Sequence, residues 1–302
     1  MDPHRPEGLP EGERGPALQE LGPGDRTEHV APGARRRVFL ELTALWLATL
    51  LAIRMVVMVQ GLGLPDVVLA AVPFLFIYAP VWLCNYRGVD SYGYRLAIPA
   101  FRDLAEWRAA ARLCGGAILV VLVPWLVGYH LYQNLVAAFL HAAGPLRDVD
   151  DVLRALARLV HGELGILGDD PVATLTRTVV PRWRVPREAW LLVPYHLFFV
   201  AIPEEIFYRG YFQTRLNEVF PRKFLIFGVP LGWGLLIACA YFAFGHSLVT
   251  VRWWHFATFF PGLLFGWMRE KSGGPLAGAL FHAWANVTVT VLDTFYGIRP
   301  TA

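Results

Sequence analysis

The stretch AWLLVPYHLFFVAIPEEIFYRG, residues 189–210, decides the fold of this chain. An apolar run leads into two adjacent carboxylates, Glu204 and Glu205, and Arg209 follows one helical turn later. An ionisable side chain within an apolar membrane span costs several kcal/mol, so each one indicates a functional site. The stretch therefore predicts a membrane-spanning helix that carries charged groups for a chemical reason.

The composition of the whole chain also indicates a membrane protein. Of its 302 residues, 56% are apolar, 14% are aromatic and only 17% are charged. A soluble domain carries about a quarter charged residues, so this apolar surplus needs a lipid phase. It argues against a water-soluble enzyme, a nucleic-acid-binding protein and a disordered chain. The three cysteines, in or beside apolar runs and without CxxC spacing, are interpreted as small buried apolar residues.

The distribution of apolar residues predicts an all-α integral membrane protein, a polytopic bundle of about seven to eight transmembrane helices. Residues 1–37 are rich in Pro, Gly and charge and predict a disordered cytoplasmic tail. Residues 38–302 form the helical membrane domain, and residues 98–112 are interpreted as an interfacial helix. A long polar stretch, 142–188, leaves room for an eighth element. The predicted spans are 38–60, 65–84, 113–141, 189–208, 224–245, 253–268 and 275–296.

The distribution of basic residues predicts the orientation. With the N-terminus inside, the inner connections carry an excess of Arg and Lys, as the positive-inside rule requires. The outer connections hold only Arg252 and Arg299. We expect a cytoplasmic N-terminus and a multi-pass protein of the cell (inner) membrane, and the arginine-rich composition favours a bacterial source. The inner residues are Arg87, Arg95, Arg102, Arg108, Arg112, Arg215, Arg222, Lys223, Arg269 and Lys271.

Three polar motifs lie on separate predicted spans. In the first, Glu205 and Arg209 share a helix face and can pair, which leaves Glu204 free to hold a water; the alternative is a solvated helix end. The second is Phe242 with His246, for which a helix-capping histidine is the alternative. The third, His282 with Asn286, lies among small residues, and its alternative is a hydrogen bond between helices.

Glu-Glu-x-x-x-Arg, Phe-x-x-x-His and His-x-x-x-Asn, in this order, resemble the CPBP family of CAAX-processing and bacteriocin-processing glutamic-type intramembrane endopeptidases. The resemblance covers a catalytic core at about 189–290. It implies that Glu204 activates water, that His246 helps to hold it, and that His282 and Asn286 stabilise the oxyanion. Glu205, Arg209 and Phe242 are then supporting residues. Independently, peptide hydrolysis needs a general base, and side-chain donors such as His and Asn suit an oxyanion hole.

This resemblance implies the substrate and partners. We expect a membrane-anchored protein or peptide, cleaved in or beside its membrane segment, and no nucleic acid. Bacterial members act in C-terminal processing or sorting, and the myxosortase-like branch is one such possibility. No cofactor is expected, although Glu204, His246 and His282 could bind Zn²⁺ through three ligands and an open position. The absence of an HExxH helix excludes a site-2 type of zinc protease.

Other classes remain as alternatives. Gly245-His246-Ser247 loosely resembles the motif of a rhomboid protease, but that interpretation leaves Glu204 and Arg209 unexplained. An aspartyl intramembrane protease needs two paired Asp residues, and the sequence shows no second one for Asp293. The same carboxylates and histidines could form the proton relay of a transporter, or the chain could be a catalytically silent scaffold of the family. The predicted spans place two residues of the site at different depths in the membrane. If the fifth apolar run spans 224–245, His246 lies near its outer end, whereas Glu204 lies nearer the middle of the membrane. Bends at Pro203, Pro221 or Pro230 are therefore expected.

Overall fold

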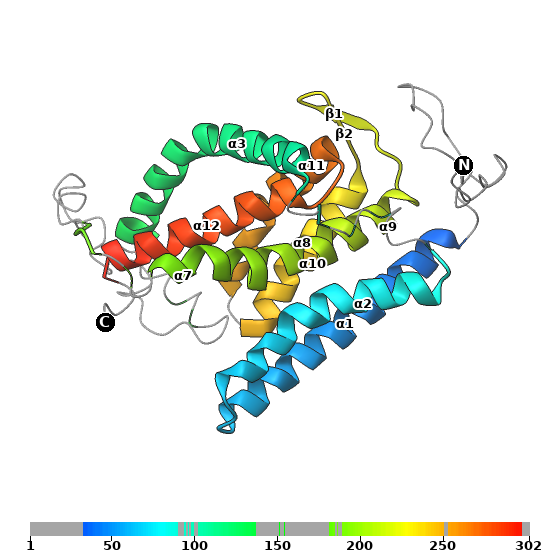
Figure 1. Cartoon of the computed structure of the whole chain (residues 1–302), viewed down its shortest axis with the longest axis horizontal. Coiled ribbons are helices and arrows are strands. Elements are labelled where there is room, and N and C mark those ends of the chain that lie inside the picture. The colour runs from blue at the N-terminus through cyan, green and yellow to red at the C-terminus, as the bar shows by residue number, and fades with distance from the viewer. Residues whose placement is uncertain are drawn as a thin grey trace, which may run out of the picture.

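The computed structural model describes residues 33–89, 94, 96, 98, 99, 102–136, 151, 154, 181–184, 186, 189–250 and 253–297. The predicted tail and the polar stretch 142–188 lie almost wholly outside these residues. The described elements are helices and one small hairpin (Figure 1). They are α1 (Ala34–Gly61), a 3-10 turn (Asp66–Ala70), α2 (Ala71–Tyr86), α3 (Leu104–Leu131) with a π-helical end (Tyr132–Val136), α7 (Ala189–Pro194), α8 (Ile202–Glu205), α9 (Thr214–Asn217), β1 (Phe224–Ile226), β2 (Val229–Leu231), α10 (Trp233–Thr250), a 3-10 turn (Trp253–Thr258), α11 (Phe259–Ser272) and α12 (Leu276–Phe295).

The prediction of an all-α membrane protein is confirmed. Within the described residues, four helices are long and apolar enough to cross a membrane, and Trp233–Val249 is apolar but shorter. The four are Ala34–Gly61, Val67–Tyr86, Leu104–Asn134 and Ala189–Asn217. The number of spans, seven to eight, stays a prediction. The buried residues form one large core, and Cys84, Cys114 and Cys239 are buried and unbridged as expected.

The interfacial helix expected at 98–112 is not a separate element. From Leu104 onward this stretch is continuous with α3, which is 28 residues long. Asp103 caps it, since its side chain accepts a hydrogen bond from the Glu106 amide at 3.4 Å. An acidic N-cap residue followed three positions later by Glu satisfies the first free amides of a helix. The helix therefore begins before the apolar run, and its arginines lie on its first turns.

The helix expected at 224–245 begins later, because its first residues form a hairpin. β1 and β2 pair antiparallel, and the turn between them places Phe227 and Gly228 at φ 49° and 74°. Two consecutive positive φ angles make the tight turn that a right-handed two-stranded hairpin needs, and they end any helix. Pro230 lies on β2, where it pairs with Leu225, so no helical run passes through it. Helix α10 therefore starts at Trp233.

The later start of α10 removes the predicted difference in depth between Glu204 and His246. Gly234, at the start of α10, packs directly against Asn217, at the end of α9. Glu204 lies 217 − 204 = 13 residues before that point, and His246 lies 246 − 233 = 13 residues beyond the start of α10. At the helical rise both residues are roughly 15–20 Å from this end of the bundle. The two antiparallel helices thus bring Glu204 and His246 to the same depth.

The helix from Ala189 to Asn217 is widened on both sides of the two glutamates. π-helical stretches occupy Tyr195–Ala201 and Ile206–Gln213, and the α-helical segment α8 lies between them. Pro203 has no amide hydrogen for the hydrogen-bonding ladder, and its ring crowds the carbonyl four residues earlier. A wider turn accommodates that ring, and π-bulges are common at functional sites. The expected irregularity at Pro203 is present as this widening.

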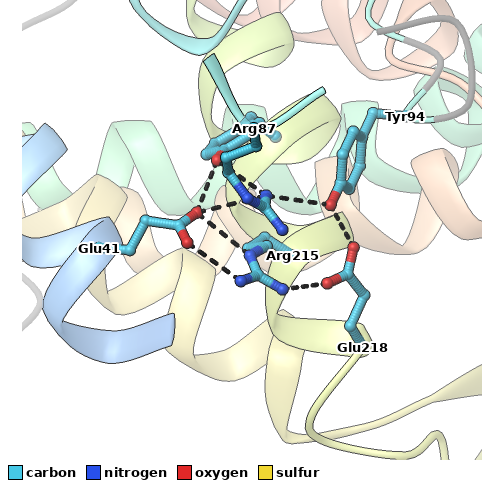
Figure 2. Close-up of polar contacts among 6 residues, drawn as sticks. Glu41, Arg87, Tyr94, Arg215 and Glu218 are labelled. Atoms are coloured by element: carbon cyan, nitrogen blue, oxygen red, sulfur yellow. Dashed lines mark hydrogen bonds and ion pairs between the residues drawn. The ribbon is translucent and has the colours of Figure 1, made fainter. Parts of the chain in front are cut away.

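An ion-pair network joins the N-terminal helices to this helix (Figure 2). Glu41 of α1 accepts hydrogen bonds from Arg215 Nε and Nη2 at 3.1 and 3.0 Å and from the Tyr211 hydroxyl at 2.7 Å. Arg87, at the end of α2, lies 3.5 Å from the same carboxylate. Burial raises the pKa of Tyr94 to about 12, so Tyr94 stays protonated and donates to Glu218. One carboxylate on α1 therefore fixes two other helices.

Replacing Glu41 with Gln should lower the stability of the protein by about 2 kcal/mol, because hydrogen bonds to charged groups in partly buried networks contribute that much. Thermal unfolding in detergent micelles measures this change. Glu106→Gln, an exposed glutamate on the first turn of α3, is the matched control and should cost less than about 1 kcal/mol. Equal losses in the two variants would contradict the importance of the network.

Candidate active site

Six of the seven side chains of the three motifs, all except Asn286, meet in the interior of the bundle. Glu204 Oε2 lies 3.7 Å from His246 Nε2 and 3.9 Å from His282 Nε2. Neither distance is a hydrogen bond, and the Glu204 Oε2 atom is buried without a hydrogen-bond partner. The side chain of Glu204 is only 14% exposed. The structure therefore brings one carboxylate and two imidazoles from three helices to one point.

Glu205, the second carboxylate of the motif, forms a buried ion pair with Arg209. The Arg209 Nη1 atom lies 3.4 Å from Glu205 Oε1, and both side chains are fully buried. His282 Nδ1 lies 3.1 Å from the same oxygen, and because a carboxylate accepts, His282 Nδ1 is the donor. A buried charge must be paired, since an uncompensated one is strongly destabilising. Glu205 thus orients His282 while Arg209 balances its charge.

Aromatic rings and a glycine surround the Arg209 guanidinium. Its central carbon lies 4.3 Å from the centroid of Phe242 and 5.2 Å from that of Phe265. Its Nη2 donates to the carbonyl of Gly262 at 3.2 Å. A Cβ atom at position 262 would lie only 3.0 Å from this nitrogen, so glycine is needed for the close approach. Phe242 also contacts His246, with ring centroids 4.4 Å apart, and so links the arginine to the histidine.

Gly266 of α11 accepts a hydrogen bond at its carbonyl as Gly262 does. One turn beyond Arg209, Gln213 Nε2 donates to the carbonyl of Gly266 at 3.0 Å. The two glycines are four residues apart, which is the small-residue spacing that lets membrane helices approach closely. The sequence interpretation did not include these glycines, although the Gly-x-x-x-Gly pattern within the run 253–268 is the signal that would have found them.

Trp46 of α1 contacts the site from outside the three motifs. Its Nε1 donates to the carbonyl of Tyr241 at 3.1 Å, and a Cβ atom on Gly245 would lie 3.3 Å from the same nitrogen. The Tyr208 hydroxyl also packs against Gly245, where that Cβ atom would lie 2.6 Å away. Trp46 and Tyr208 therefore fix the turn of α10 that presents His246. Nothing in the pattern of α1 or in the motif spacing singles out Trp46, because only the tertiary fold brings it here.

The structure does not bring Asn286 into direct contact with the other site residues. Asn286 is half-buried on α12, one turn beyond His282. Within the described residues, no hydrogen bond joins its side chain to Glu204, His246 or His282. Its backbone carbonyl accepts from the Thr290 hydroxyl at 2.9 Å. The i, i+4 spacing keeps Asn286 on the face of α12 that carries His282.

No group of three or more His, Cys, Asp or Glu side chains in the described part of the chain is arranged to hold a metal ion. The alternative zinc set, Glu204, His246 and His282, is nevertheless close together, at the distances given above. Glu205 pairs with Arg209 and with His282, so it contributes no further ligand. The absence of a cofactor stays a prediction.

Part of the chain matches a known protein family. Residues 186–288 match the family described as Rce1-like, Type II CAAX prenyl endopeptidase Rce1-like. The matched region contains every motif residue from Glu204 to Asn286, and it confirms the resemblance found in the sequence. It supports a protease of the CAAX-type intramembrane class. No curated protein and no solved structure matches the chain.

Replacing Trp46 with Phe should reduce turnover about tenfold with little change in KM, because it removes the N–H group that binds the Tyr241 carbonyl of α10. Tyr208→Phe should have a similar effect, and the double variant should lose little more than either single one, since both side chains pack on the same turn of α10 at Gly245. Turnover of a reporter substrate in liposomes measures these effects.

Thr43→Val is the matched control for Trp46. It removes the Thr43 to Tyr241 hydroxyl hydrogen bond of 2.6 Å between the same two helices, away from His246. We expect a comparable fall in melting temperature and unchanged turnover. If Thr43→Val and Trp46→Phe reduce turnover equally, Trp46 acts only through stability.

Proposed function

Taking residues 186–288 as a catalytic core of the Rce1-like type, we propose that the protein hydrolyses a peptide bond of a membrane-anchored substrate, with Glu204 as the general base. The observation that carries the proposal is the position of the Glu204 carboxylate opposite two imidazoles, with no hydrogen bond to either. A structural carboxylate at this depth would be paired, as Glu205 is. The Glu204 side chain as a whole is 14% exposed, although its Oε2 atom is buried.

The tautomer of His246 supports the placement of the reacting water. His246 Nδ1 lies 3.0 Å from the carbonyl of Phe242. A carbonyl oxygen only accepts, so Nδ1 donates, and a neutral imidazole then presents a lone pair at Nε2 toward Glu204. Two acceptors 3.7 Å apart cannot bond each other, but one water can donate a proton to each. Both protons of that water are then engaged, and its free lone pair can attack a carbonyl carbon.

His282 is suited to stabilise the negative charge that develops on the substrate. Glu205 accepts from its Nδ1, which orients the ring. In the proposed role Nε2 also carries a proton, which it donates toward the reaction centre, next to Glu204. Asn286, one turn further on the same face of α12, is the second candidate donor. Such donors, when fixed before the reaction, contribute about 3–4 kcal/mol to catalysis.

The proposed reaction proceeds in two proton transfers. Glu204 removes a proton from the water as its oxygen attacks the scissile carbonyl, and the oxyanion accepts hydrogen bonds from His282 and Asn286. Glu204 then gives its proton to the leaving nitrogen, and the C–N bond breaks. The products are a carboxylate and an amine. Glu205 and Arg209 hold the site in place, and no step passes through a metal ion.

The substrate class follows from the family and from the membrane. We propose a protein that is cleaved near its C-terminus, beside a lipid anchor or a membrane segment, in the course of processing or sorting. The bacterial inner membrane and a cytoplasmic N-terminus belong to the same proposal. The myxosortase-like branch is the narrowest form of it, and its support is limited to the sequence resemblance.

Replacing Glu204 with Gln should reduce turnover at least a thousandfold, because the amide has the size of the carboxyl group but cannot accept the proton. His246→Ala should have an effect in the same direction. Mass spectrometry of the C-termini of membrane-anchored exported proteins, in a host that expresses each variant, measures processing. Glu106→Gln is the control and should process normally. Unchanged processing in both site variants would exclude the protease function.

Exhaustive chelation should leave the activity of the purified protein unchanged, because the proposed base is a carboxylate and its water is held by His246. The measurement compares turnover before and after dialysis against a strong zinc chelator, with metal content followed by elemental analysis. Loss of activity that returns on addition of Zn²⁺ would replace the glutamate mechanism with the zinc alternative.

A further inference from the structure

The hairpin of β1 and β2 exposes a continuous apolar surface. Phe224, Leu225, Ile226 and Phe227 are between 47% and 86% exposed, and Phe227 is the most exposed of them. The opposite side of the hairpin is buried, since Val229 and Leu231 pack with Leu235 and Cys239 of α10. The hairpin is therefore firmly attached to the bundle while its tip remains uncovered (Figure 1).

The turn of this hairpin is unfavourable for an isolated structure in water. Phe227 has a φ of 49°, a left-handed conformation that Asn or Gly adopts readily and that a bulky side chain disfavours. A large aromatic side chain is thus presented outward at a position where Asn-Gly is the usual pair. An observed backbone outlier of this kind points to a function of the side chain. An apolar environment outside the protein would compensate for the strained backbone of Phe227 and for the exposure of its aromatic ring.

Contacts with α11 place the hairpin at the depth of the membrane interface. Trp267 Nε1 donates to the carbonyl of Ile226 at 3.1 Å, so the tip lies beside this tryptophan. Lys271, one turn later, lies 5.3 Å from the Trp267 ring. Tryptophan and lysine at the end of a membrane helix are typical of the boundary between hydrocarbon and headgroups. The apolar tip therefore lies next to lipid rather than beyond it in water.

The basic residues around the hairpin fit acidic headgroups. The chain has only two lysines, Lys223 and Lys271, and both are exposed beside the hairpin. Lys223 precedes β1, and its amide donates to Leu231 at the base of the hairpin. Arg35 of α1 contacts the same end of the bundle through the carbonyl of Val219. The positive-inside rule assigns such an end to the cytoplasmic leaflet, whose surface is negative.

We propose that the hairpin 224–231 inserts its tip into the lipid leaflet at the basic end of the bundle, and that Lys223 and Lys271 bind the headgroups of acidic phospholipids there. The hairpin thereby fixes the depth of α11, which supplies the Gly262 carbonyl to Arg209. This surface is separate from the candidate active site, and the proposal does not depend on the protease function.

Site-specific fluorescence tests the insertion of the tip. Phe227→Cys, labelled with an environment-sensitive dye in nanodiscs, should emit as in an apolar medium and should be quenched by lipids that carry a nitroxide near the headgroup. Arg36→Cys, an exposed position on the first turn of α1, is the water-facing control. Wild-type protein, whose cysteines are buried, gives the labelling background. If the dye at position 227 emits as the dye at position 36 does, and the lipids do not quench it, the proposal is overturned. The tip would then be a binding surface for a protein partner.

Varying the lipid tests the role of the lysines. Binding of fluorescent phosphatidylglycerol to the detergent-solubilised protein should weaken about fivefold for each of Lys223→Gln and Lys271→Gln. Arg54 of α1 donates to the carbonyl of Val249 at the end of α10, away from the hairpin, so Arg54→Gln should leave binding unchanged. Equal binding in wild type and in the double lysine variant would exclude acidic headgroups as the partner. Each lysine variant should keep the melting temperature of the wild type in detergent, which shows that it folds.

Discussion

The buried ion pair between Glu205 and Arg209 is the interaction on which the rest of the catalytic core depends. A charge pair in the interior of a membrane protein is costly to desolvate, and contacts from other helices offset part of that cost. Here α10 provides the ring of Phe242, α11 provides the Gly262 carbonyl, and α12 provides His282. Three helices therefore converge on the charges of one helix, and Glu204 is left as the carboxylate without such partners.

Much of the site could be predicted from the sequence, because its residues are those that are costly in lipid. Glu204, Glu205 and Arg209 are conspicuous in an apolar run, and the i, i+4 pair predicted between Glu205 and Arg209 is present. The meeting of His246 with Glu204 was expected only from the resemblance. Single-helix spacing could not show it, since the contact depends on where two antiparallel helices begin. The assignment of 224–231 to a helix was wrong because an apolar run of this length does not distinguish a hairpin from a helix.

The N-terminal helices are part of the frame of the site, although they lie outside the matched region 186–288. Glu41 holds Arg215 at one end of the long helix, and Trp46 binds the Tyr241 carbonyl of α10. Both contacts join residues more than 150 positions apart, so no local pattern indicates them. The core of the family thus receives its geometry partly from helices that its own motifs do not describe.

The arrangement of Glu205 and Arg209 on a single helix also bears on how the protein enters the membrane. Because the two residues are four positions apart, their charges can neutralise each other as soon as the helix forms. The segment 189–217 can then leave the translocation machinery without waiting for the helices that are synthesised after it. Helices α10, α11 and α12 subsequently replace water around a pair that already exists. The order of synthesis and the order of assembly therefore agree, and the most polar span of the core is also the one that is made first.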